Sequence, residues 1–178
     1  MDDSDSSQQS PDRPPSDEPP SSGAGLRVDI LDASRSLHAD DAEWLRHHVE
    51  AACTNLRLRG EVRAKIVDDD AMAEAHDRYS GVAGTTDVLT FDLSEPNSAE
   101  TDVDLLLCID VATRQAEPRG HRAREELLLY AVHGVLHTLG YDDHDEDAAA
   151  RMHAEEDRIL NAIGVGTVYA KPTAEAPR

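Results

Sequence analysis

The segment AREELLLYAVHGVLHTLG, residues 123–140, constrains the fold more than any other part of the sequence. Almost every residue after Glu126 is apolar, and the run ends at Gly140, a residue typical of helix C-termini. A helix that is apolar on all sides must be covered on most of them. We therefore predict a helix over residues 123–140 that lies at the centre of a domain.

Four further segments have the composition of β-strands. Leu26, Val28 and Ile30 alternate with polar residues, which predicts a half-buried strand at the start of the folded part. The apolar run from Leu105 to Ile109 belongs to a predicted strand that we expect to be covered on both faces. The four predicted strands span residues 26–32, 61–69, 86–93 and 103–110.

Three other segments are predicted to be helices. In the first, apolar residues recur at helical spacing between Asp40, the expected N-cap, and Gly60, the expected terminator. His47 and His48 lie on this helix, and we assign them no ligand role. With 178 residues and a hydrophobic fraction of 39%, the chain is predicted to form a single α/β or α+β domain. The three predicted helices span residues 40–60, 71–81 and 145–164.

Both ends of the chain are predicted to lie outside the folded domain, which we place at residues 26–170. Residues 1–25 are rich in Ser, Pro and Asp, and they have no apolar residue between Met1 and Ala24. Burial therefore cannot offset the entropy of ordering them. Residues 1–25 are predicted to form a disordered acidic tail, and residues 171–178 a frayed C-terminus.

The net charge of -20 argues against a broad surface for polyanions, although it is compatible with a local basic groove. Aromatic residues make up only 3% of the chain, so a surface of rings for stacking bases is not available. No segment approaches 18 consecutive apolar residues, and the N-terminus lacks the pattern of a secretion signal. We predict a cytoplasmic protein that does not contact a membrane, with Cys53 and Cys108 as buried thiols.

The central helix also carries a pair of histidines, His133 and His137. Residues four apart project from one helix face, so both imidazoles can bind the same metal ion. Asp142, Asp143 and His144 follow the turn at Gly140 and supply further possible ligands. Three protein ligands leave a fourth position for water, as in catalytic zinc sites.

Gly134 stands where peptidases with the HExxH motif have a glutamate as general base. A peptidase mechanism would therefore lack its proton acceptor at this position. The pattern HGVLH is typical of a zinc site but not of a zinc peptidase.

Three motifs together resemble the YbeY family of metal-dependent endoribonucleases: HGVLHTLGYDD, TTDVLTFDL and VDLLLCIDVATRQAEPRGH. The resemblance extends from about Leu26 to Gly164. It implies an α+β domain with a zinc-binding helix packed on a small mixed sheet, and one Zn²⁺ per chain. It also implies cleavage of single-stranded RNA, maturation of ribosomal RNA at the 3′ end of the small subunit, and ribosome quality control, with the ribosome and its RNA as partners. The oligomeric state stays open.

The resemblance assigns His133 and His137 to the first two metal positions of the family. At the third position the family commonly has a histidine, whereas this chain has Asp143, followed by His144. We favour Asp143 as the third ligand, because carboxylate oxygen is an ordinary zinc ligand, and keep His144 as the alternative. If Asp143 binds the metal, His144 becomes a speculative general base.

A second departure from the family is Ser80, which stands where an arginine is expected. The missing arginine is an expected phosphate contact. Arg78, Arg114 and Arg119 are the candidates to replace it in binding RNA. Its loss, with the acidic composition, motivates an alternative function as a non-catalytic zinc-containing ribosome assembly factor. A metal-dependent hydrolase of another substrate is a further alternative.

Overall fold

The computed structural model describes residues 25–168, so the predictions for the two ends of the chain lie outside the described residues, except at Gly25. Its four strands form one sheet in the order β1-β2-β4-β3. The strands β1, β2 and β4 are parallel, and β3 is antiparallel to β4. The sheet is therefore mixed, as predicted. The strands are β1 (Leu26–Asp32), β2 (Gly60–Val67), β3 (Val88–Asp92) and β4 (Thr101–Cys108).

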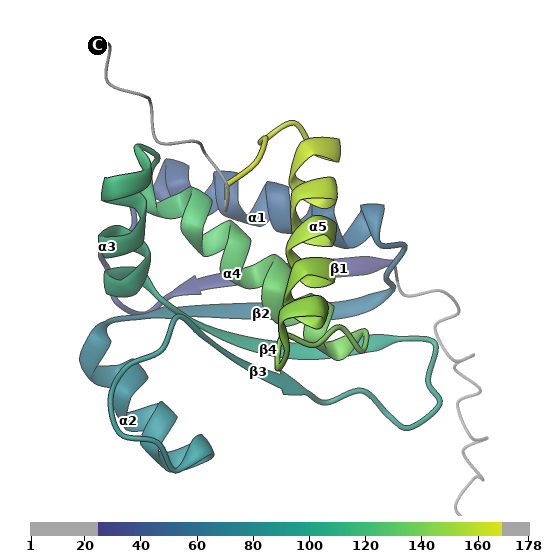
Figure 1. Cartoon of the computed structure of the whole chain (residues 1–178), viewed down its shortest axis with the longest axis horizontal. Helices are drawn as coiled ribbons and strands as arrows, with labels where there is room; N and C mark the ends of the chain where they lie inside the picture. Colours follow the sequence, from purple (N-terminus) through teal and green to yellow (C-terminus); the bar gives the residue numbers. More distant parts are fainter. Residues whose placement is uncertain (1–24, 169–178) are drawn as a thin grey trace, which may run out of the picture.

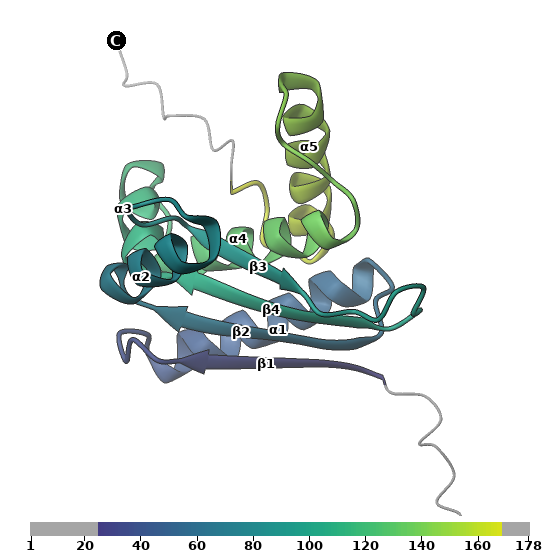
Figure 2. The ribbon, with the colours of Figure 1, turned by 90° about the horizontal axis from the view of Figure 1, so that it is seen from below.

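Five helices surround this sheet, and four of them share one side. Figure 1 shows α1, α3, α4 and α5 above the sheet and α2 below it. Figure 2 shows the molecule from below, with the strands side by side in the order β3, β4, β2 and β1. The helices are α1 (Ala39–Asn55), α2 (Asp69–Ser80), α3 (Ile109–Arg119), α4 (Ala123–Thr138) and α5 (Glu146–Ala162).

The core lies between the sheet and the upper helices, and the alternation along the strands creates it. Val62 and Ile66 of β2 and Leu105 of β4 are buried on the face toward α4, whereas Arg63 and Lys65 alternate onto the other face. Most of α4 is buried, which confirms the predicted central helix. The mixed sheet with its packed helices is the α+β architecture that the sequence implied.

Several details differ from the sequence prediction. The helix α1 ends at Asn55, and Gly60, its expected terminator, is instead the first residue of β2. The strand expected over residues 103–110 ends at Cys108, and α3 follows at once from Ile109, where no helix was predicted. The helical signal there is weak because α3 buries small residues, Ala112 and Ala116, and carries Pro118 in its last turn. His38 rather than Asp40 is the N-cap of α1, so the Asp40 prediction was wrong.

Among residues 25–168, no helix is both long and apolar enough to span a membrane. Cys53 and Cys108 are buried and do not form a disulfide, as predicted. Burial raises the pKa of the Cys53 thiol to about 12, so this group is unreactive in the folded protein.

Candidate metal centre

The position of α4 against the sheet places the two histidines beside β3. A methyl group built on Gly134 would lie 2.6 Å from the Thr90 hydroxyl oxygen and 2.8 Å from a methyl carbon of Leu105. A larger residue at this position would force the side chains of Thr90 and the buried Leu105 to move. Glycine avoids this cost. Gly134 is therefore the contact that brings α4 down onto β3 and β4.

His133 and His137 face each other on α4. Their Nε2 atoms are 3.0 Å apart, and the two rings are nearly perpendicular, at 85°. The His133 side chain is 20% exposed and that of His137 is 32% exposed. The pair is half-buried and open to solvent on one side, as a ligand pair for a reactive metal must be.

The other ring nitrogens fix the tautomers of both histidines. Nδ1 of His137 donates to the Tyr141 carbonyl oxygen at 3.1 Å, because a carbonyl can only accept. Nδ1 of His133 lies 2.7 Å from Oε1 of Glu156, and a carboxylate likewise accepts. In the neutral form of each ring, Nε2 therefore carries the lone pair, and the two Nε2 atoms converge. A carboxylate behind a histidine is the usual support of a metal-binding imidazole.

The electrostatic surroundings of His133 favour positive charge. Burial by itself would lower the pKa of His133. The hydrogen bond and charge of Glu156, with the charges of Asp87 and Asp143, outweigh burial and raise the pKa. The same negative groups would attract a cation to the space between the two rings.

The turn after α4 brings a carboxylate to the histidine pair. Gly140 has a φ of 87°, which reverses the chain after the helix. One oxygen of Asp143 then lies 3.7 Å from Nε2 of His133, and the other lies 3.9 Å from Nε2 of His137. His144 is 83% exposed and pairs with Asp142. The structure thus brings Asp143, rather than His144, to the pair.

The separations within this group suit a zinc ion. Nitrogen and oxygen ligands bind zinc at about 2.0–2.2 Å, which places the ligand atoms of a tetrahedral site about 3.3–3.6 Å apart. The two Nε2 atoms, 3.0 Å apart, are slightly closer than that range, and the nearer Asp143 oxygen of each histidine, at 3.7 and 3.9 Å, is slightly beyond it. His133, His137 and Asp143 can therefore hold one metal ion after small side-chain movements.

Two hollows meet at His133. One, of about 460 Å³, lies toward α3 and α5 and is also lined by Asp143. The other, of about 590 Å³, follows β3 and is also lined by His137. An extended substrate could therefore pass the histidine pair from one hollow to the other.

Glu156 and His153 of α5 also belong to this site, and the sequence analysis gave them no role. Glu156 is only 1% exposed, although it is a glutamate, and both of its oxygens bind imidazoles. A signal was present in the sequence, since Glu156 shares the apolar face of α5 with Met152 and Ile159. A buried carboxylate requires partners, which would have indicated a role.

Asp87 lies at the edge of both hollows. Its Oδ1 accepts hydrogen bonds from the Thr86 hydroxyl at 3.1 Å and from the Val88 amide at 2.8 Å. These bonds brace the start of β3. Asp87 thus stabilises the strand and adds negative charge near His133.

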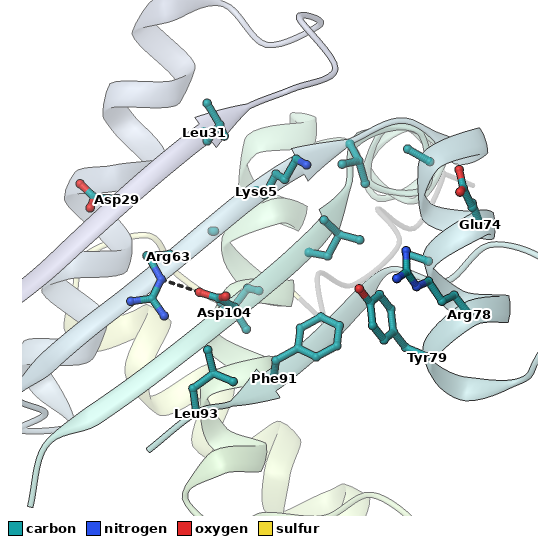
Figure 3. A pocket seen from close by; sticks show the side chains of 16 residues that line it. Asp29, Leu31, Arg63, Lys65, Glu74, Arg78, Tyr79, Phe91, Leu93 and Asp104 are labelled. Atoms are coloured by element: carbon teal, nitrogen blue, oxygen red, sulfur yellow. Dashed lines mark hydrogen bonds and ion pairs between the residues drawn. The ribbon is translucent and has the colours of Figure 1, made fainter. Parts of the chain in front are cut away.

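The three candidate arginines lie in different places. Arg119 lines the hollow that contains His133 and Asp143. Arg114 instead forms a bidentate pair with Asp69. Arg78 is on α2, below the sheet, where it lines a separate cavity of about 720 Å³ beside other side chains of that face (Figure 3). The structure places Arg119 at the hollow that His133 also lines, and Arg78 on the opposite face of the sheet.

A family pattern and two relatives that match this chain carry the same description. Residues 29–164 match the pattern of the family described as Endoribonuclease YbeY. A Micrococcus luteus protein of that name is 34% identical over 84% of this chain and 99% of its own. A Geobacillus thermodenitrificans protein of the same name is 32% identical over 79% of this chain and 97% of its own.

The fold has a counterpart among solved structures. The solution structure of a Thermotoga maritima protein superimposes with a TM-score of 0.56, at 22% identity, over 77% of this chain and 89% of that one. This likeness concerns the fold alone. The match over residues 29–164, together with relatives aligned over nearly their whole length, confirms the resemblance seen in the sequence: the chain belongs to the YbeY family.

Proposed function

We propose that this chain is a metal-dependent endoribonuclease that hydrolyses single-stranded RNA during the maturation of ribosomal RNA. The proposal extends to the 3′ end of the small-subunit RNA, to ribosome quality control, and to action in the cytoplasm with the ribosome as partner. The convergence of His133, His137 and Asp143 where two hollows meet is the observation that supports it most. The relatives' name, Endoribonuclease YbeY, supports the choice of RNA as substrate.

In this proposal, Nε2 of His133, Nε2 of His137 and a carboxylate oxygen of Asp143 hold one Zn²⁺ per chain. A bound zinc ion lowers the pKa of a water molecule and offsets negative charge on phosphoryl oxygens. Glu156 and the Tyr141 carbonyl hold the two imidazoles in the metal-binding tautomer. His144 is not a ligand in this proposal, because its ring pairs with Asp142 in solvent.

Arg119 is the arginine that we propose to contact an RNA phosphate. Its side chain lines the hollow beside His133, and Nη1 lies 2.6 Å from Oε1 of the buried Glu126. The ion pair holds the guanidinium in place, so little side-chain entropy is lost when a phosphate binds. Arg114 and Arg78 are weaker candidates, because one is bound to Asp69 and the other lies below the sheet.

A non-catalytic assembly factor with a mainly structural zinc ion is the second candidate. Two observations favour it: Ser80 replaces the family arginine, and the net charge is -20. A metal-dependent hydrolase of another substrate is the third candidate, since the ligand group alone does not select RNA.

One experiment separates these functions. Purified protein with a measured zinc content is incubated with single-stranded RNA, double-stranded RNA and a peptide mixture, beside the variant His137→Ala. We expect cleavage of single-stranded RNA alone, and its loss in the variant. Equal cleavage by the variant would indicate a contaminant and would favour the assembly factor. Cleavage of the peptides would favour the third candidate.

A further inference from the structure

The carboxylate of Glu156 lies between two imidazoles. Its Oε1 is 2.7 Å from Nδ1 of His133, and its Oε2 is 2.9 Å from Nδ1 of His153. His153 precedes Glu156 by three residues on α5, so the two side chains share one helix face. One buried carboxylate thus orients a proposed zinc ligand and a second histidine together.

This bond determines what His153 can do. Because a carboxylate accepts, Nδ1 of His153 carries the proton, and Nε2 on the opposite edge of the ring is an acceptor. The His153 side chain is 30% exposed and lines the hollow of about 460 Å³ that also contains His133, Asp143 and Arg119. A histidine oriented by a carboxylate and facing a substrate hollow has the geometry of a general base.

The other candidates for a base fit less well. Gly134 has no side chain, and its position has no space for one. His144 is exposed, pairs with Asp142, and is not among the residues that line either hollow at His133. We propose that His153 is the general base of the RNA hydrolysis and that Glu156 is its positioning residue. This inference rests on the proposed function.

In this step, one phosphodiester bond is hydrolysed by one water molecule. Nε2 of His153 accepts a proton from a water molecule while the water oxygen forms a bond to phosphorus. The bond between phosphorus and the leaving ribose oxygen breaks, and its electron pair stays on that oxygen. The leaving oxygen takes a proton from solvent, and His153 returns its proton to solvent. The products are one phosphate monoester end and one hydroxyl end.

The test compares the full-length variants His153→Ala and His153→Gln with the unchanged protein. Zinc content, melting temperature, kcat and KM are measured on single-stranded RNA, with and without added imidazole. We expect kcat to fall about 100-fold or more in both variants, with KM and zinc per chain unchanged. Added imidazole should restore part of kcat in His153→Ala, where the ring leaves a space, and less in His153→Gln.

Two histidine controls make the result specific. His47→Ala removes an exposed histidine of α1 that lines neither hollow, and it should leave kcat unchanged. His144→Ala tests the competing base. A kcat of His153→Ala within a few-fold of the unchanged protein would overturn the proposal, and so would a loss of kcat that follows a loss of zinc. A 100-fold loss in His144→Ala with zinc retained would overturn it in favour of His144.

The failure of this inference is distinguishable from that of the proposed function. If the unchanged, zinc-loaded protein cuts no RNA, the proposed function is wrong, and the inference is wrong with it. If the unchanged protein cuts RNA and His153→Ala cuts it equally well, only the inference is wrong.

Discussion

Two buried carboxylates, Glu126 of α4 and Glu156 of α5, are alike in burial and different in their partners. Glu126 is 0% exposed and Glu156 is 1% exposed. Oε1 of Glu126 lies 2.6 Å from Nη1 of Arg119 and 2.6 Å from Nε2 of His121. Glu156 uses each of its oxygens for one imidazole, and one of these is the proposed zinc ligand His133.

The partners decide what each carboxylate does. Arg119 is permanently charged, so Glu126 forms an ion pair that joins the end of α3 to the start of α4. Burial raises the pKa of the neighbouring Tyr130 hydroxyl, and the negative charge of Glu126 raises it further. Both partners of Glu156 are imidazoles that line the hollow of about 460 Å³ beside the candidate metal centre. The comparison indicates that Glu126 joins two helices and holds Arg119, whereas Glu156 orients two imidazoles of the candidate metal centre.

The largest expected effect is the loss of zinc on substitution of Asp143, which belongs to the same candidate metal centre as Glu156. Asp143→Ala should lose most of its zinc, about as much as His137→Ala, because a site of three protein ligands becomes one of two. His144→Ala should keep one zinc ion per chain. Zinc per chain, measured on purified protein by elemental analysis, tests this. Full zinc in Asp143→Ala with loss in His144→Ala would show that the histidine is the third ligand.

Glu126→Ala should destabilise the fold by about 3–5 kcal/mol, because it leaves the charge of Arg119 and the buried ring of His121 without their carboxylate. Denaturant unfolding gives the free energy. The matched control is Glu43→Ala, which removes an exposed glutamate paired with Arg46 and should change stability little. If Glu126→Ala were as stable as the control, Glu126 would not be the structural member of the two.

Glu156→Gln should weaken zinc binding about 10- to 100-fold while it destabilises the fold less than Glu126→Ala does. An amide keeps the shape of the side chain and one acceptor for an imidazole, but it loses the negative charge behind His133. Competition with a coloured zinc chelator measures the affinity. Unchanged zinc affinity would place Glu156 beside Glu126 as a purely structural group.

The smallest effect should come from Arg119→Lys. Lysine keeps the charge opposite Glu126 but loses the planar set of donors that matches a phosphate. KM for single-stranded RNA should rise about 3- to 10-fold, or roughly 1 kcal/mol, while kcat and zinc content stay the same. Arg114→Lys is the control, because Arg114 is engaged with Asp69. An equal rise in KM in both variants would show that Arg119 is not the specific phosphate contact.

The parts of the site that the sequence predicted are the local ones. His133 and His137 are one helical turn apart, so their common face follows from the helix alone. Glu156 is 23 residues away from His133, and its contact depends on how α5 packs against α4. No local pattern contains that packing, so the proposed base beside it was missed, and the exposed His144 was considered instead.

The fold shows the same division. The alternation in β1, the apolar run in β4 and the apolar length of α4 predicted the sheet and its central helix, because burial imposes those patterns directly. The helix α3 was missed, because a strand passes into it without a polar break and its buried side chains are small. Where a segment buries alanine rather than leucine, hydrophobic periodicity carries little information.

The close approach at Gly134 also limits how this scaffold could evolve. A zinc peptidase of the HExxH type needs a glutamate at that position of the helix. Here even the first carbon of such a side chain would collide with Thr90 and Leu105. A glutamate at this position would therefore require the side chains of Thr90 and Leu105, or the helix itself, to move first. The tight packing at Gly134 thus disfavours the glutamate of a zinc peptidase, although both kinds of site use a pair of histidines four residues apart.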